Sequence, residues 1–146
     1  MTPVSALGLD IGRRRIGVAG CDGTGLIATG LTTVYRRSFA ELVTDIQHIA
    51  LARQAQVLVV GLPLTMDGEE GFQSRQVRKV AEGLGQALDL PVIYMDERLS
   101  SVEAEQLMLA AGHSVAHDKA LIDRKAAAII LQRWLDERRS SSARRK

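Results

Sequence analysis

The chain has 146 residues, which is enough for one domain with a hydrophobic core and too few for two domains of the usual size. Hydrophobic residues make up 46% of the sequence and charged residues 25%, as in globular proteins, and the apolar runs are too short for a membrane span or a signal segment. We therefore expect a cytoplasmic protein with no membrane segment. The single cysteine, Cys21, excludes an internal disulfide and a zinc cluster built on cysteines.

The positive charge is concentrated at one end of the chain. The formal net charge is +2, but five basic residues fall within residues 138–146. Without them, 14 of the 19 basic residues remain against 17 acidic residues, so residues 1–137 have a net charge of −3. We expect a folded domain over residues 1–137 and a disordered basic tail over 138–146, because the tail lacks apolar periodicity. Such a tail can bind a polyanion, although solvated charged ends are common.

The first part of the chain predicts a three-stranded antiparallel meander followed by a helix. Residues 4–10 are almost all small or apolar, which is typical of a strand covered on both faces. Two further β-type runs, over 16–21 and 26–34, are joined by residues that tolerate a tight turn. Ser38 is a favourable N-cap, and the apolar spacing after it predicts an amphipathic helix to about Gln54.

The rest of the chain alternates predicted strands with predicted helices. In chain order these are a strand over 57–62, a helix over 77–88, a strand over 92–95, a helix over 101–112 and a helix over about 118–138. Strands that alternate with helices favour parallel βαβ units. The predicted fold class is therefore α/β, a single domain with a mixed five-stranded sheet and helices on both faces.

Four acidic residues fall where ligands gather or where apolar residues are expected. Asp10 ends the first strand, Asp96 and Glu97 follow the last strand, and Asp123 lies on the apolar stripe of the final helix. Inward carboxylates repel one another unless a cation pairs with them. Because oxygen ligands suit magnesium or manganese, these acids predict a metal site.

Other roles for the same acids stay open. An aspartate at the end of a strand is commonly a turn former or a helix cap, which applies to Asp10 taken alone. Asp123 could instead pair with Arg98 or with Arg124. The coincidence of acids at two strand ends and on one buried helix stripe favours the metal site over these alternatives.

Four segments together resemble the YqgF/RuvX family of Holliday-junction-resolvase-like and pre-16S rRNA nucleases. They are GLDIGRRRIGVAGCD, VVGLPLTMDGEEG, MDERLSSVEA and IDRKAAAIILQRWL, and the match runs from about Leu7 to Leu135. The resemblance implies a ribonuclease H-like fold, a two-metal nuclease centre and a nucleic-acid substrate. The chain departs from the pattern that we expect of the family at Arg14, Ser101 and Arg124, and none of these changes removes a carboxylate.

Carried over position by position, the resemblance implies that the family's acids are Asp10, the pair Asp96 and Glu97, and Asp123. Two Mg²⁺ or Mn²⁺ ions held by Asp10, Glu97 and Asp123 would act on a phosphodiester. Glu97 is favoured over Asp96 because neighbours in an extended segment point to opposite sides and the family resemblance implies Glu97. The expected nucleic-acid-binding residues are Arg13, Arg14, Arg15, Arg98 and Arg124, since a guanidinium suits a phosphate; an ordinary solvated face is the alternative.

Several functions remain open at this level. The nuclease would act in 5′-end processing of pre-16S rRNA, on branched or single-stranded DNA or RNA, or on both, as a monomer or a weak homodimer. A non-catalytic RNA-binding factor in ribosome assembly would keep the same residues. An ATP-binding protein of the sugar-kinase or actin-like kind would share the first strand and its aspartate, but would need a second such domain.

Overall fold

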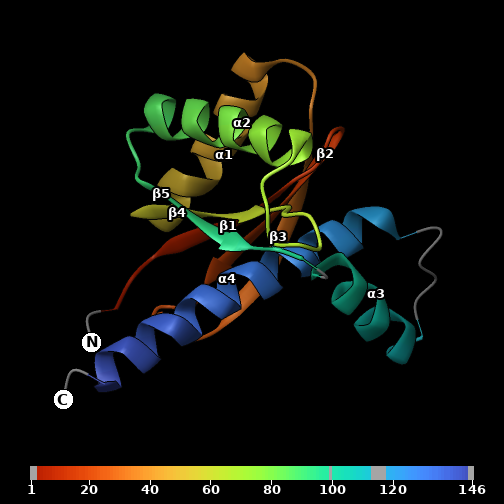
Figure 1. Ribbon diagram of the computed structural model, residues 1–146. Helices are drawn as coiled ribbons and strands as arrows, with labels where there is room; N and C mark the ends of the chain where they lie inside the picture. The colour runs from red at the N-terminus through yellow and green to blue at the C-terminus, as the bar shows by residue number, and fades with distance from the viewer. Residues whose placement is uncertain (1–2, 99, 113–117, 145–146) are drawn as a thin grey trace.

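A five-stranded mixed sheet forms the centre of the protein (Figure 1). The computed structural model describes residues 3–98, 100–112 and 118–144. The elements are β1 (Ala6–Ile11), β2 (Arg15–Cys21), β3 (Ala28–Tyr35), α1 (Phe39–Arg53), β4 (Val57–Leu62), α2 (Phe72–Leu88), β5 (Val92–Asp96), α3 (Ser100–Ala110) and α4 (Lys119–Arg144). This order confirms the predicted order of strands and helices.

The sheet combines the predicted meander with two parallel additions. Its strand order is β3-β2-β1-β4-β5; β1, β2 and β3 pair antiparallel, whereas β4 pairs parallel to both β1 and β5. The carboxyl ends of β1, β4 and β5 therefore meet at one end of the sheet. This is the end where a parallel-sheet fold places its ligands.

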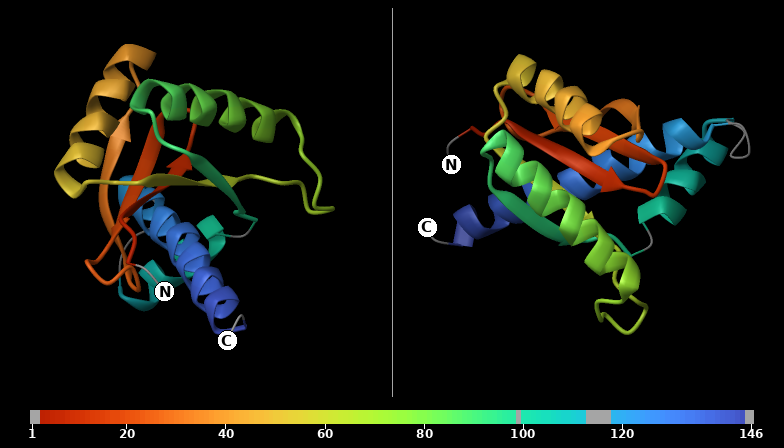
Figure 2. Two further views of the ribbon diagram at one scale, coloured as in Figure 1. Left: turned by 90° about the vertical axis from the view of Figure 1, so that its left-hand side faces the viewer. Right: turned by 90° about the horizontal axis from the view of Figure 1, so that it is seen from above.

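The helices lie in two layers on opposite faces of the sheet (Figure 2). Leu7, Leu9 and the other β1 side chains of odd number pack under α1 and α2, while Ala6 contributes to the core under α4. Because side chains alternate along a strand, Asp10 points to the α4 face. On its outer side α4 packs against α3, through Met108 and Ile122.

Glycines on the α4 face allow this helix to lie directly on the sheet. A Cβ atom at Gly17 would lie 2.0 Å from the carbonyl oxygen of Asp123, and one at Gly8 would lie 2.8 Å from the carbonyl oxygen of Ala127. Any larger residue at Gly17 would collide with helix backbone. Since Gly17 is the β2 partner of Asp10, this contact brings Asp123 close to Asp10.

The structure differs from the predictions mainly at the ends of elements. The first strand begins at Ala6, not at residue 4. Helix α4 continues to Arg144, so residues 138–144 of the predicted disordered tail are helical, and its last two residues, 145–146, lie outside the described residues. Extension of an existing helix needs no new nucleation, and arginines near a helix C-terminus interact favourably with its dipole. Ser38 caps α1 as predicted, its Oγ accepting a hydrogen bond from Glu41 N at 3.1 Å. Among the described residues, no helix is both long enough and apolar enough to span a membrane.

Candidate active site

Asp10 lies near the carboxyl end of the central strand β1, partly buried beneath α4. Its neighbour on β2 is Gly17, and on the other side Gly61 follows the β4 residue that pairs with Leu9. Two glycines beside one aspartate leave room above the sheet for other groups. Burial raises the pKa of the Asp10 carboxyl, the nearby charge of Asp123 raises it further, and a hydrogen bond with Glu97 opposes both effects.

Glu97 occupies the space above Gly61 and meets Asp10. Its backbone N–H donates to Leu62 O at 3.1 Å, which extends the parallel pairing one residue beyond β5. A Cβ atom at Gly61 would lie 2.7 Å from Glu97 Oε2. Burial, together with the charge and the hydrogen bond of Asp10, raises the pKa of Glu97 to about 9. At neutral pH and without a cation, Glu97 therefore keeps its proton and donates a hydrogen bond to Asp10.

Asp123 approaches the same region from α4, but its carboxylate is paired with an arginine. Arg15 Nε lies 2.6 Å from Asp123 Oδ2, and the two side chains are only 28% and 21% exposed. The partner is thus neither Arg98 nor Arg124, the two arginines considered from the sequence. Arg15 itself was expected to bind phosphate, and in the structure it holds an acid of the site.

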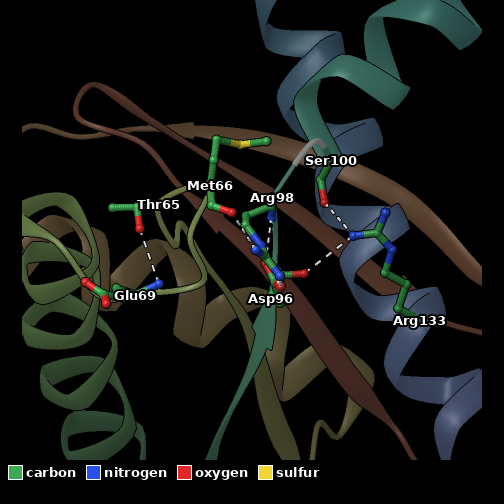
Figure 3. A network of polar contacts seen from close by, with 7 residues as sticks. All are labelled: Thr65, Met66, Glu69, Asp96, Arg98, Ser100 and Arg133. Carbon is green, nitrogen blue, oxygen red and sulfur yellow. Dashed lines mark hydrogen bonds and ion pairs between the residues drawn. The ribbon is translucent and has the colours of Figure 1, made fainter.

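Asp96, the last residue of β5, is bound by Arg98 (Figure 3). Arg98 Nη2 lies 2.6 Å from Asp96 Oδ2, and this hydrogen-bonded pairing lowers the pKa of Asp96. Arg98 Nη1 also donates to Met66 O at 3.2 Å, so the pair ties the loop between β4 and α2 to the end of β5. On the other side, Arg133 donates to Ser100 Oγ and to Asp96 O. The geometry gives Asp96 a structural contact and leaves Glu97 as the acid that faces Asp10.

The other arginines predicted to bind nucleic acid lie in two different settings. Arg13 and Arg14 are exposed in the turn between β1 and β2, whereas Arg124 is partly buried and donates to Thr33 Oγ1 at 3.2 Å. Arg13 also lines a groove of about 640 Å³ beside the N-terminus of α2. The sequence reasoning did not find this groove, whose other polar or aromatic lining residues are Arg36, Phe72, Gln73 and Gln76.

The donor set fits a hard divalent cation at Asp10 and Glu97. Two partly buried carboxyl groups in hydrogen-bond contact tolerate each other only if a proton or a cation lies between them, and oxygen donors suit Mg²⁺ or Mn²⁺. With Asp123 turned to Arg15, the described residues contain no group of three or more acidic, histidine or cysteine side chains placed to hold a metal. Two of the three predicted ligands, Asp10 and Glu97, are therefore placed to hold a cation, while the third, Asp123, is paired with Arg15.

Relatives of known description cover nearly the whole chain. Residues 4–137 match the family model described as RuvX, Holliday junction resolvase. A protein of Trichormus variabilis is 62% identical over 139 residues, covering 95% of this chain and 92% of its own length. One from Crocosphaera subtropica is 55% identical over 141 residues, covering 97% and 99%. Both carry the name of a proposed pre-16S rRNA nuclease.

Solved structures share the fold at low sequence identity. The RuvC of T. thermophilus in complex with a Holliday junction substrate has a TM-score of 0.61 at 13% identity, and the match covers 94% of this chain and 96% of that one. The Fowlpox virus resolvase, in complex with Holliday junction DNA, has a TM-score of 0.57 at 10% identity, with 92% and 98% covered. Both likenesses confirm the predicted resolvase-like α/β fold.

Proposed function

Because the chain belongs to the RuvX family of Holliday junction resolvases, we propose that it is a metal-dependent nuclease that hydrolyses phosphodiester bonds of nucleic acid. The observation that carries the proposal is the contact between Asp10 and Glu97 at the carboxyl ends of the parallel strands. Two acids that share a proton in a partly buried site stabilise the fold less than an apolar pair would at the same positions. Such a pair therefore indicates a functional site.

In this proposal the acidic residues bind the cations and the arginines bind the phosphates. Asp10 and Glu97, with Asp123 as a third ligand, would hold two Mg²⁺ or Mn²⁺ ions, which supply an attacking water of lowered pKa and stabilise the departing oxygen. Glu97 must lose its proton for this, so cation binding releases a proton. Arg13 and Arg14, exposed in the turn that follows β1, would bind the phosphates that flank the cleaved bond.

We propose RNA as the substrate, and specifically the 5′ region of pre-16S rRNA, which the names of the relatives support. A branched DNA junction is the second candidate, supported by the family description. A junction resolvase needs two centres on opposed strands, and hence a two-fold dimer. The oligomeric state in solution, which we expect to be a monomer or a weak homodimer, therefore bears directly on the choice of substrate.

The test compares acid variants on defined substrates. Purified protein is incubated with labelled RNA that spans the 5′ end of 16S rRNA, with single-stranded DNA and with a four-way junction, in Mn²⁺, in Mg²⁺ or in EDTA. Asp10→Asn should lose at least about 100-fold in cleavage rate, since even groups that only support a metal ligand cost 10–100-fold. Asp45→Asn is the matched control, because Asp45 is exposed on α1 across the sheet.

Each outcome separates one function from another. Cleavage by the wild type and Asp45→Asn, lost in Asp10→Asn and in EDTA, supports the nuclease. Equal cleavage by all three proteins would show a contaminating enzyme and leave the proposal refuted. RNA binding without cleavage under every condition would identify a non-catalytic RNA-binding factor, and specific ATP binding in its place would identify the kinase-like function.

A further inference from the structure

Arg15 and Asp123 form an ion pair, although Arg15 was expected to bind phosphate and Asp123 to bind a metal ion. Arg15 ends the arginine run that follows β1, and Asp123 is the acid that α4 brings to Asp10. Their contact, 2.6 Å between Nε and Oδ2, is shielded, with 28% and 21% of the side chains exposed. A shielded ion pair is screened less than a surface pair and competes more strongly with other partners.

Each partner of this ion pair could also bind another group: Arg15 a phosphate, and Asp123 a cation. Among the described residues, Arg15 bonds Asp123 through Nε, and neither of its terminal nitrogens has a hydrogen-bond partner. The backbone of Asp123 is fixed against Gly17, so only its side chain can turn between Arg15 and Asp10. Because Gly17 is the β2 partner of Asp10, the Asp123 side chain starts from a position next to Asp10.

We infer that Arg15 and the metal cation compete for the Asp123 carboxylate, and that a nucleic-acid phosphate bound by Arg15 frees Asp123 to become the third metal ligand. The inference rests on the proposed function and adds a positioning role to Arg15. A guanidinium that binds phosphate through its fork no longer neutralises Asp123 as fully. Nucleic acid and cation then strengthen each other's binding, because coupling between two sites is reciprocal.

The test is a cycle of Mn²⁺ affinities, measured by isothermal titration on the full chain without nucleic acid. Arg15→Gln should bind Mn²⁺ at least ~5-fold more tightly than the wild type, the lower end of usual coupling. Arg124→Gln removes an equal charge from a side chain bonded to Thr33, with no ion pair to Asp123, and should gain far less. In an Asp123→Asn background, Arg15→Gln should bring no gain, because the freed ligand is missing.

A merely structural ion pair would give a different cycle. If Arg15→Gln tightens Mn²⁺ binding equally with Asp123 and with Asn at that position, the effect is one of net charge and the inference is overturned. It is also overturned if Arg15→Gln binds Mn²⁺ as the wild type does. Should Arg15→Gln fail to fold, Arg15→Met keeps the apolar stem of the side chain and carries the same expectations.

The role of phosphate is tested with a short single-stranded phosphorothioate oligonucleotide as the probe. At saturation it should tighten Mn²⁺ binding by the wild type and leave the affinity of Arg15→Gln unchanged; equal tightening in both would overturn the proposed release. Failure of the proposed function looks different. Mn²⁺ binding that is absent from the wild type, or that persists in Asp10→Asn, would refute the metal site itself, and this inference with it.

Discussion

The contact between Gly17 and α4 makes a direct prediction for Gly17→Ala. The new Cβ would lie 2.0 Å from the carbonyl oxygen of Asp123 and 2.3 Å from its carbonyl carbon. Carbon atoms do not approach backbone closer than about 3.0 Å, so α4 must move away by at least about 1 Å, the difference between 3.0 and 2.0 Å. The obstacle is backbone and not a flexible side chain, so no rotamer change relieves it.

The cost follows from overpacking in a closely packed interior. Such insertions cost about 1–3 kcal/mol, and at roughly 3 °C per kcal/mol for a chain of this size the melting temperature should fall by about 3–9 °C. Because Asp123 carries the collision, its carboxylate also moves away from Asp10. Folded Gly17→Ala protein should therefore bind Mn²⁺ more weakly and cleave more slowly than the wild type.

Thermal unfolding without metal, together with Mn²⁺ titration of the folded protein, checks both effects. Gly23→Ala is the matched control, since a Cβ atom there meets nothing within 4 Å and the change should stay within about 0.5 kcal/mol. A Gly17→Ala protein as stable as the wild type would refute the close approach of α4. An equal loss of stability in Gly23→Ala would show that lost glycine, and not the contact, is responsible.

Three further predictions concern single side chains. The raised pKa of Glu97 means that the metal-free folded protein holds an extra proton between pH 4.5 and about 9, so its stability should fall as pH rises through this window, by at most ~1.4 kcal/mol per pH unit. Denaturant melts over this range should show a flatter dependence for Glu97→Gln, and an unchanged slope would contradict the assignment. Asp96→Asn breaks a half-exposed pair with Arg98 and should lower stability by no more than ~1 kcal/mol, while Mn²⁺ titration should give an affinity close to that of the wild type and far above that of Asp10→Asn. Ser38→Ala removes the cap of α1 and should cost about 1 kcal/mol in thermal unfolding without changing cleavage, since α1 lies across the sheet.

The fold could be predicted from the sequence because each element is locally consistent. The continuous apolar run over 57–62 and the helical spacing after Ser38 have one plausible structure each, and the turn at 22–25 closes through Gly25 at positive φ. The end of α4 could not be predicted in the same way. Its last turns continue a helix that is already formed, and no apolar pattern in residues 138–144 marks them.

The contacts within the candidate site could likewise be predicted only in part. The alternation of side chains along an extended segment predicts that Asp96 and Glu97 point to opposite sides, and the family resemblance favoured Glu97. In the structure Glu97 contacts Asp10 and Asp96 pairs with Arg98, while the choice of Glu97 as a metal ligand stays a prediction. The partner of Asp123 could not be predicted, because Arg15 and Asp123 are 108 positions apart and meet only where α4 packs against β2. That packing depends on Gly17, which in the sequence looks like any strand glycine.

The two glycines beside Asp10 explain how three acids come together on one sheet. The space above Gly17 is filled by the backbone of Asp123, and the space above Gly61 by the side chains of Ile130 and Glu97. Asp10 therefore contacts Glu97 and lies close to Asp123. The approach of Asp123 is fixed by its backbone against Gly17, whereas Glu97 approaches with its side chain. A change at Asp123, such as the exchange of Arg15 for a cation, would therefore alter the electrostatic environment of Asp10 directly, and that of Glu97 through Asp10.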